Sequence, residues 1–216
     1  MSKDISKTLG KVIGGSVVVA GSLTIIALMA SSSALKSAFK EFGHIGKRIH
    51  DVSNKEEIIT STNPEAVVKE LSMMKAEDVA AGVEGPAVIL GADTVVAHGG
   101  RILGKPKDKE DAIQMISSFA GQEHYVYTGV CIIIKEVDDS EELISFAEGT
   151  KVVVYPMTEQ EILDYVESGE CDDKAGSYAI QGLFAPYIKE IEGDYYNVVG
   201  LPVSYLYQEM KKAGVL

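Results

Sequence analysis

Val88-Ile89-Leu90-Gly91-Ala92-Asp93-Thr94-Val95-Val96 is an apolar run that carries a single carboxylate, Asp93, among small residues. The run predicts a strand that holds one acid where a ligand has room to approach. Gly99-Gly100 comes next, and paired glycines accept the positive φ angles of a tight hairpin. The return strand ends at Gly104-Lys105-Pro106, which fixes a lysine on a stiff corner near the acid. An acid and a lysine on adjacent strands suit metal-assisted phosphate chemistry.

A second stretch, Asp173-Lys174-Ala175-Gly176-Ser177-Tyr178-Ala179-Ile180-Gln181-Gly182, predicts a polar loop that leads into a strand of small residues. Such a place lets a backbone approach a ligand closely. Neither stretch decides the function alone. A strand-end Asp is also typical of a turn or cap, and Lys-Pro is a common surface corner.

In this order and at this separation, the two stretches resemble the Maf family of nucleoside triphosphate pyrophosphatases, the septum-formation-inhibitor homologues of the inosine-triphosphatase-like superfamily. The resemblance runs from about Ile25 to the C-terminus. It includes Tyr127-Thr128-Gly129-Val130, Pro156 with Thr158 and Glu159, Glu192-Gly193-Asp194-Tyr195 and Asn197-Val198-Val199-Gly200-Leu201-Pro202. It implies an N-terminal extension over 1–22 and one domain over 23–216. The expected fold is α/β, a mixed, bent β-sheet flanked by helices around a central cleft.

The resemblance implies hydrolysis of dTTP or UTP, with modified pyrimidine nucleotides as further substrates, to the monophosphate and pyrophosphate in a house-cleaning role. The attacked phosphorus is shielded by negative charge, so the site needs a base, a divalent cation (Mg²⁺ or Mn²⁺) and positive side chains. Asp93 is expected to activate the water or to hold the metal, with Glu56 as the second acidic partner, although Glu57 offers a register shifted by one. Lys75 and Lys105 would stabilise the triphosphate charge, whereas by itself Lys75 reads as a solvated helix lysine.

Other family positions would contact the rest of the nucleotide. The loop from Ser31 to Ser33 would donate hydrogen bonds to phosphate oxygens, and Lys36 would add a charge. Thr94 and Gln181 would recognise the base, because a side-chain amide can pair with the carbonyl and imide edge of uracil or thymine. Both positions resemble the dTTP/UTP branch of the family.

The chain departs from the family after its first strand. Maf proteins usually carry Ser-x-Ser-Pro-Arg-Arg, and here Ser31-Ser32-Ser33-Ala34-Leu35-Lys36 places Leu35 and Lys36 where the arginines are expected. Lysine keeps the charge without the bidentate fork of arginine, and leucine keeps neither. Two alternatives therefore stay open: a catalytically weakened nucleotide-binding regulator linked to cell division, and a 7-methyl-GTP-type pyrophosphatase. A homodimer is the expected assembly by family resemblance.

Composition agrees with one compact enzyme domain of 216 residues, 46% hydrophobic. A net charge of −12 argues against binding to nucleic acid, which needs a basic face. Cys131 and Cys171 stand far apart in the sequence and predict neither a disulfide nor a zinc site, so a cytoplasmic location is the default. The four histidines, His44, His50, His98 and His124, are expected at the surface or at strand edges.

The N-terminal region is ambiguous. No charged residue occurs over 12–34, and Lys3, Lys7 and Lys11 precede it, as in a membrane anchor. Glycine and serine dilute the run, however, and the resemblance makes Ile25 to Ala30 the first strand. A soluble extended N-terminus is therefore favoured over membrane anchoring.

Caps and periodicity predict the remaining elements. Asn63 and Pro64 open a helix, and Asp108 with Asp111 opens another that Gly121 ends. Thr158 caps a third, and Pro202 opens the C-terminal helix. The predicted helices span 34–42, 64–81, 108–121, 158–168 and 202 onward, and the predicted strands span 124–136 and 151–155, with a solvated acidic loop at 138–142.

Overall fold

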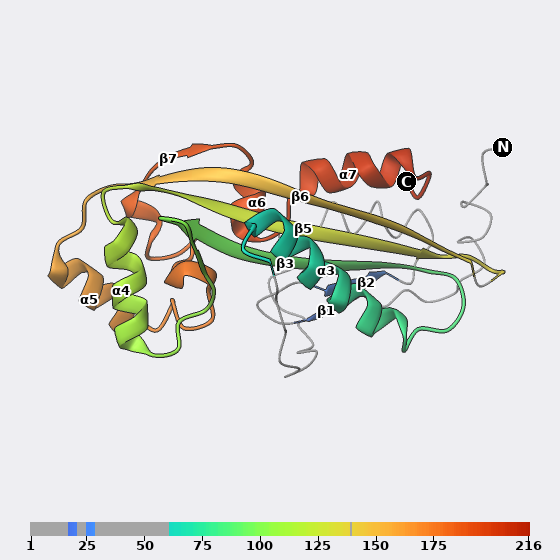
Figure 1. Ribbon diagram of the computed structural model, residues 1–216, viewed down its shortest axis with the longest axis horizontal. Helices are drawn as coiled ribbons and strands as arrows, with labels where there is room; N and C mark the ends of the chain where they lie inside the picture. Colours follow the sequence, from blue (N-terminus) through green and yellow to red (C-terminus); the bar gives the residue numbers. More distant parts are fainter. Residues whose placement is uncertain (1–16, 21–24, 29–60, 139) are drawn as a thin grey trace.

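A long antiparallel sheet runs through the protein (Figure 1). The computed structural model describes residues 17–20, 25–28, 61–138 and 140–216. The strand order is β1-β2-β3-β5-β6-β7, and the short β4 also pairs with β3. The strands are β1 (Val17–Ala20), β2 (Ile25–Leu28), β3 (Ala87–His98), β4 (Arg101–Leu103), β5 (Glu123–Lys135), β6 (Glu141–Val154) and β7 (Ile188–Glu192). All pairings among these strands are antiparallel.

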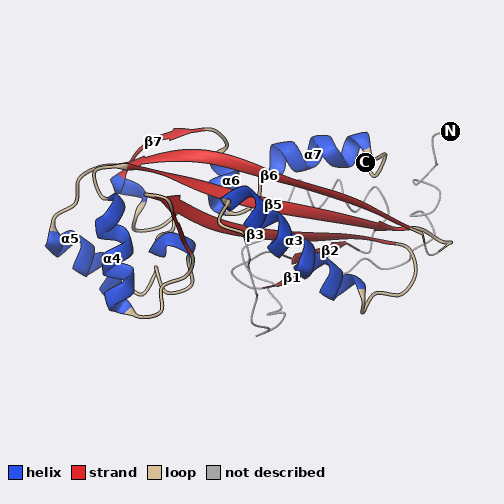
Figure 2. Ribbon diagram, viewed as in Figure 1, coloured by secondary structure: helices blue, strands red, loops and turns tan. Residues whose placement is uncertain are grey.

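Helices cover the two faces of one half of the sheet (Figure 2). Helix α3 (Pro64–Ala80) packs on the face that includes Ile89, and α7 (Val203–Lys212) packs on the opposite face, which includes Leu90. Successive residues of a strand point to opposite faces, so this apolar stretch of β3 is buried on both sides. That double burial explains why it reads as a continuous hydrophobic run.

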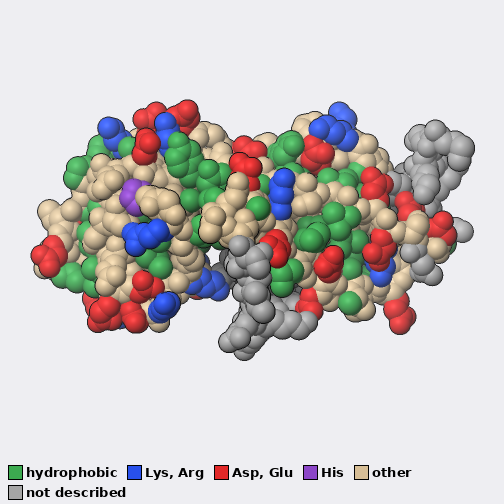
Figure 3. Space-filling model, in the orientation of Figure 1, with side chains coloured by type: hydrophobic (Ala, Val, Ile, Leu, Met, Phe, Trp, Pro, Cys, Tyr) green, Lys and Arg blue, Asp and Glu red, His purple; other side chains and the backbone are tan. Residues whose placement is uncertain are grey.

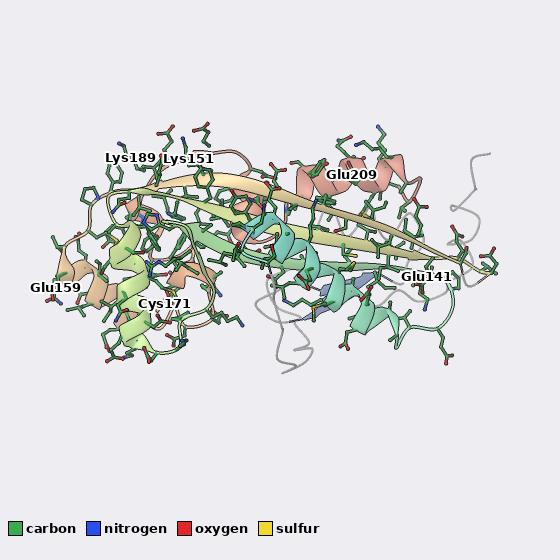
Figure 4. All side chains as sticks on the ribbon, viewed as in Figure 1. Glu141, Lys151, Glu159, Cys171, Lys189 and Glu209 are labelled. Atoms are coloured by element: carbon green, nitrogen blue, oxygen red, sulfur yellow. The ribbon has the colours of Figure 1, made fainter. Side chains whose placement is uncertain are left out.

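The other half of the molecule has its own aromatic core. It is formed by the far ends of the long strands together with α4 (Lys109–Phe119), α5 (Glu159–Glu167), and the short 3₁₀ helices η1 (Ala175–Ser177) and η2 (Ala185–Tyr187). Phe119 and Phe184 are fully buried at its centre. Cys171 lies beside α4 and α5 (Figure 4). Helix α6 (Tyr195–Val199) contacts β5 and β6 between the two halves.

The helix predictions are confirmed wherever the structure describes them. Asn63 accepts hydrogen bonds from the amides of Glu65 and Ala66, Asp108 caps α4, and Thr158 forms a capping box with Glu161. The helix expected over 34–42 lies outside the described residues. The predicted strand over 25–30 is present as β2, and β1 precedes it within the predicted extension. Among the described residues, no helix is both long and apolar enough to cross a bilayer.

Three local predictions were wrong. The strand expected at 151–155 starts at Glu141, so Glu141 and Glu142 belong to β6 and not to a loop. The segment after Ser177 forms turns instead of a strand, because its amides bond to carbonyls three residues earlier and to side chains such as Tyr165, and not to a neighbouring strand. His124 is 1% exposed and not superficial, because it packs beneath Phe119 and Tyr178.

Candidate functional site

Helix α3 lies unusually close to β3 and β5, because glycines face it at the crossing points. A Cβ on Gly91 would stand 2.9 Å from both the Cβ and the backbone nitrogen of Ala76, and closer still to the carbonyl oxygen of Ser72. A Cβ on Gly129 would overlap the backbone of Val68. Any larger residue at these points would hold the helix away from the sheet. The glycines therefore set the height at which α3 carries Lys75 over β3.

At that height Lys75 contacts Asp93, the predicted catalytic acid. The Nζ of Lys75 donates to Oδ1 of Asp93, and the side chains are 11% and 2% exposed. Lys75 is thus not a solvated helix lysine. A positive partner offsets the cost of removing a carboxylate from water, so this buried acid is compatible with a stable fold.

Asp93 lies beside a gap between β2 and β4 among the described strands. One edge of β3 pairs with β5 over 87–97. On its other edge, β2 pairs with residues 88–91 and β4 with residues 96–98. No described strand pairs with residues 92–95 on that edge. An extended stretch that no described strand pairs on one edge, next to a charged pair, is a place where a ligand can reach backbone groups and both faces of the sheet.

The hairpin decides which backbone groups face the gap. Gly99 and Gly100 have φ angles of 57° and 74°, so a two-residue turn of the primed type joins β3 to β4. In such a hairpin the flanking pair, His98 and Arg101, exchanges backbone hydrogen bonds, and alternate residues of β3 face the same edge. By this alternation the amide and carbonyl of Thr94 point into the gap.

The side chain of Thr94 lies on the sheet face opposite to Asp93. Its Oγ1 is 2.9 Å from Oγ1 of Thr128 on β5, and Thr128 in turn donates to the carbonyl of Asn197 in α6. Asp93 faces α3, whereas Thr94 faces α6. The two neighbours can therefore serve different parts of one ligand that occupies the gap.

The second stretch singled out in the sequence meets the first. The amide of Gly176 donates to the carbonyl of Gly104 at 2.9 Å, just before Lys105. A Cβ on Gly176 would stand 2.7 Å from Cγ2 of Val96, so the loop lies directly on β3. Ser177 beside it has a φ of 63°, a conformation that is uncommon outside glycine. Lys105, next to this contact, is exposed, and so is Gln181 farther along the loop.

Buried groups that sequence reasoning missed hold the loop in place. Nε2 of His124 is 2.8 Å from the hydroxyl of Tyr178, and the hydroxyl of Tyr165 accepts from the amide of Ala179. Burial, with a smaller effect from His98, lowers the pKa of His124 to about 3, so the ring stays neutral at pH 7. Only the tertiary packing brings these residues together, although Tyr178 lies within the stretch 173–182.

The turn that carries Gln181 is fixed by Glu170. Both carboxylate oxygens of Glu170 lie within 3.0 Å of the backbone nitrogen of Leu183. A Cβ on Gly182 would overlap the same carboxylate, so a larger residue there would displace the end of the Glu170 side chain. Gln181 thus stands on a short, restrained turn.

The described residues provide little that would hold a metal by protein ligands alone. They contain no group of three or more His, Cys, Asp or Glu side chains arranged around a cation. Asp93 supplies hard carboxylate oxygens, which suit Mg²⁺ or Mn²⁺, and such ions are commonly held by one or two carboxylates plus substrate phosphates. The donor chemistry therefore fits a cation shared with a phosphate chain. Four further predicted site residues, Glu56, Ser31, Ser33 and Lys36, lie outside the described residues.

Charged side chains of both signs are mixed on one face of the molecule (Figure 3). On the face drawn in Figure 3, acidic side chains lie along both halves, with lysines and arginines scattered among them. A nucleic-acid-binding face would instead gather its basic residues into a patch or stripe.

Comparison with known proteins gives consistent matches over the same region. The family model described as Maf-like protein matches residues 26–213. A protein named dTTP/UTP pyrophosphatase from Lachnoclostridium phytofermentans is 51% identical over 164 residues, 76% of this chain and 83% of that protein. One of the same name from Agathobacter rectalis is 51% identical over 172 residues, 74% and 84% of the two chains. Another, from a Geobacillus strain, is 43% identical over 187 residues, 87% and 97% of the two chains.

Proposed function

This chain belongs to the Maf-like protein family, and from that premise we propose that it hydrolyses dTTP and UTP to the nucleoside monophosphate and pyrophosphate. The relatives named for that activity match about three quarters of the chain or more, and the family model spans residues 26–213, which include β3, the hairpin and the loop at 173–182. The observation that carries the proposal is the buried Asp93–Lys75 pair at the gap in the sheet.

The proposed roles follow from the position of each group. The triphosphate would lie along the gap, where Lys75 and the exposed Lys105 approach from different elements. Fixed positive groups stabilise charge that develops on phosphate oxygens without having to reorganise. Asp93 would orient and deprotonate the attacking water at the α-phosphorus.

In the alternative role, Asp93 would hold the cation, with Glu56 as a further ligand, and Mg²⁺ or Mn²⁺ would supply charge neutralisation along the phosphates. Ser31, Ser33 and Lys36 would complete the phosphate contacts. Thr94, whose backbone faces the gap, and Gln181 would contact the base. In this proposal one domain over 23–216 acts as a homodimer.

A pyrophosphate-release assay tests the activity. We expect turnover of dTTP and UTP in the presence of Mg²⁺ or Mn²⁺, above that of CTP and 7-methyl-GTP. Asp93→Asn keeps the shape of the side chain and removes its charge, so its kcat is expected to fall at least about 100-fold. Turnover that survives in this variant would exclude the role given to Asp93.

Leu35 motivates a second candidate, a nucleotide-binding regulator with weakened catalysis. Measurable UTP binding with no turnover of any nucleotide would favour it over the enzyme. Leu35→Arg would then be expected to restore activity, because it returns a guanidinium at the position where the family carries one. A preference for 7-methyl-GTP in the same assay would instead favour the remaining alternative.

A further inference from the structure

A chain of hydrogen bonds across β3, β5 and α6 fixes the direction in which the Thr94 hydroxyl points its proton. Each hydroxyl has one proton to donate and lone pairs to accept with. Thr128 donates its proton to the backbone carbonyl of Asn197 at 2.9 Å, and a carbonyl can only accept. The proton of Thr128 is therefore already used. In the 2.9 Å contact between the two threonines, Thr94 must be the donor and Thr128 the acceptor.

The carbonyl that anchors this chain is itself held rigidly. The side-chain amide of Asn197 donates to the carbonyl of Val126 at 3.0 Å and to Oγ1 of Thr150 at 2.9 Å. Thr150 also donates to the carbonyl of Asp194 and accepts from its amide, both at 3.1 Å. Asn197, Thr128 and Thr150 are all fully buried. The direction of each bond is thus set by a backbone group and cannot reverse without leaving a buried group unpaired.

We propose that Thr128 and Asn197 are positioning residues that make the Thr94 hydroxyl an obligatory hydrogen-bond acceptor toward the base, and thereby select uracil and thymine over cytosine. The hydroxyl proton of Thr94 is donated to Thr128, so only the lone pairs of the Thr94 oxygen remain for a ligand. Uracil and thymine carry an N–H at ring position 3, which can donate to that oxygen. Cytosine carries a bare nitrogen there, which would face the oxygen as a second acceptor. The inference rests on the proposed function for the placement of the base beside Thr94.

The surroundings of Thr94 are compatible with this contact. Gly200, at the end of α6, has no side chain, and a Cβ added to it would lie 3.6 Å from Oγ1 of Thr94. That side of the hydroxyl is therefore lined by backbone and not by a side chain. Thr94 is partly exposed, unlike the three residues behind it. A chain of buried hydrogen bonds that ends in one exposed atom fixes whether that atom donates or accepts. A ligand that offers the wrong partner leaves a polar group unpaired.

The test is the ratio of kcat/KM for UTP to kcat/KM for CTP in three variants. Thr128→Val keeps the shape and removes the hydroxyl that accepts from Thr94. The Thr94 hydroxyl can then rotate and donate to cytosine, so the UTP:CTP ratio is expected to fall about tenfold. The change should appear in KM, with kcat for UTP within about twofold, because a base contact is the same in the ground state and the transition state.

Two matched variants separate polarity from general damage. Thr128→Ser retains the hydroxyl, so its ratio should stay within about twofold of the parent. Ser118→Ala removes a partly buried hydroxyl on α4 that bonds only to the carbonyl of Met115, away from Thr94, and should keep the ratio. A Thr128→Val protein that keeps the ratio would overturn the inference. So would an equal loss of the ratio in Ser118→Ala.

Ligand-side measurements on the unmodified chain guard against a variant that fails to fold. The parent should prefer UTP to 3-methyl-UTP, which lacks the N–H, by about tenfold, and equal use of both would refute the inference. Equilibrium binding of UMP and CMP gives the same comparison without turnover. If UTP is not hydrolysed yet UMP is preferred and the preference is lost in Thr128→Val, the proposed activity fails and the polarity inference stands.

Discussion

Replacing Gly91 with alanine should separate α3 from the sheet and disturb the Asp93–Lys75 pair without touching either residue. The added Cβ would stand 2.9 Å from two atoms of Ala76, whereas ordinary contact begins at 3.4 Å, and it would lie closer still to the carbonyl of Ser72. The helix must therefore move outward by at least about 0.5 Å, since a backbone cannot bend aside as a side chain can.

Overpacking of this kind costs about 1–3 kcal/mol of the free energy of unfolding. The effect on the catalytic rate should be larger than the effect on stability, because a displacement approaching 1 Å can lower a rate by about 100-fold. We expect Gly91→Ala to unfold at lower urea concentration and to lose at least about tenfold in kcat for UTP. Urea titration followed by circular dichroism, with pyrophosphate release, measures both.

Gly82→Ala is the matched control. Gly82 follows the same helix, and its Cβ would meet nothing nearer than the carbonyl oxygen of Val79 at 3.7 Å. It should leave stability within about 0.5 kcal/mol and activity unchanged. The reasoning would be refuted if Gly91→Ala matched this control in both stability and kcat.

Three further changes test the site and its supports. Lys75→Met leaves the Asp93 carboxylate without that cation and should cost up to about 3 kcal/mol. A double-mutant cycle with Asp93→Asn should give a coupling above about 1 kcal/mol, and additive effects would contradict the ion pair. Burial lowers the pKa of His124 to about 3 in the folded protein, against 6.5 for an unperturbed histidine. The unfolded chain therefore binds the extra proton, and stability should fall as pH drops from 6.5 toward 3, by at most about 1.4 kcal/mol per unit. His124→Gln should flatten that slope in urea titrations between pH 7 and 4.5, and an unchanged slope would exclude His124 as its source. Asn63→Ala removes the acceptor for two amides at the start of α3 and should cost about 1 kcal/mol, which thermal unfolding will detect or disprove.

Local rules were sufficient for the ends of helices. Asn63, Asp108 and Thr158 each cap a helix as their position predicts, since a cap depends on a side chain and an amide only two or three residues away. The same local rules gave the wrong structure for the segment after Ser177. Its small residues are typical of a strand, yet its structure is decided by distant side chains such as Tyr165 and Glu170.

The burial of His124 was equally beyond local reach. The residues beside His124 on β5 do not distinguish it from a histidine at a strand edge. Its ring is enclosed by residues from α4 and from the loop at 173–182, which are distant in the sequence. Thr128 and Asn197 were visible as parts of family motifs. Their connection to Thr94 required the pairing register of β3 with β5 and the docking of α6.

From the sequence alone one can predict the apolar run with its single acid, the Gly99-Gly100 hairpin, the capped helices and the family to which these motifs belong. Such features depend on neighbours along the chain, so they can be recognised without a fold. The fold was needed to show that Asp93 is buried against Lys75, that no described strand pairs with residues 92–95 on one edge, and that Thr94 faces the other side. The reason is that strand pairing and helix docking join residues 18 to more than 60 positions apart, and no local pattern specifies which of them will meet.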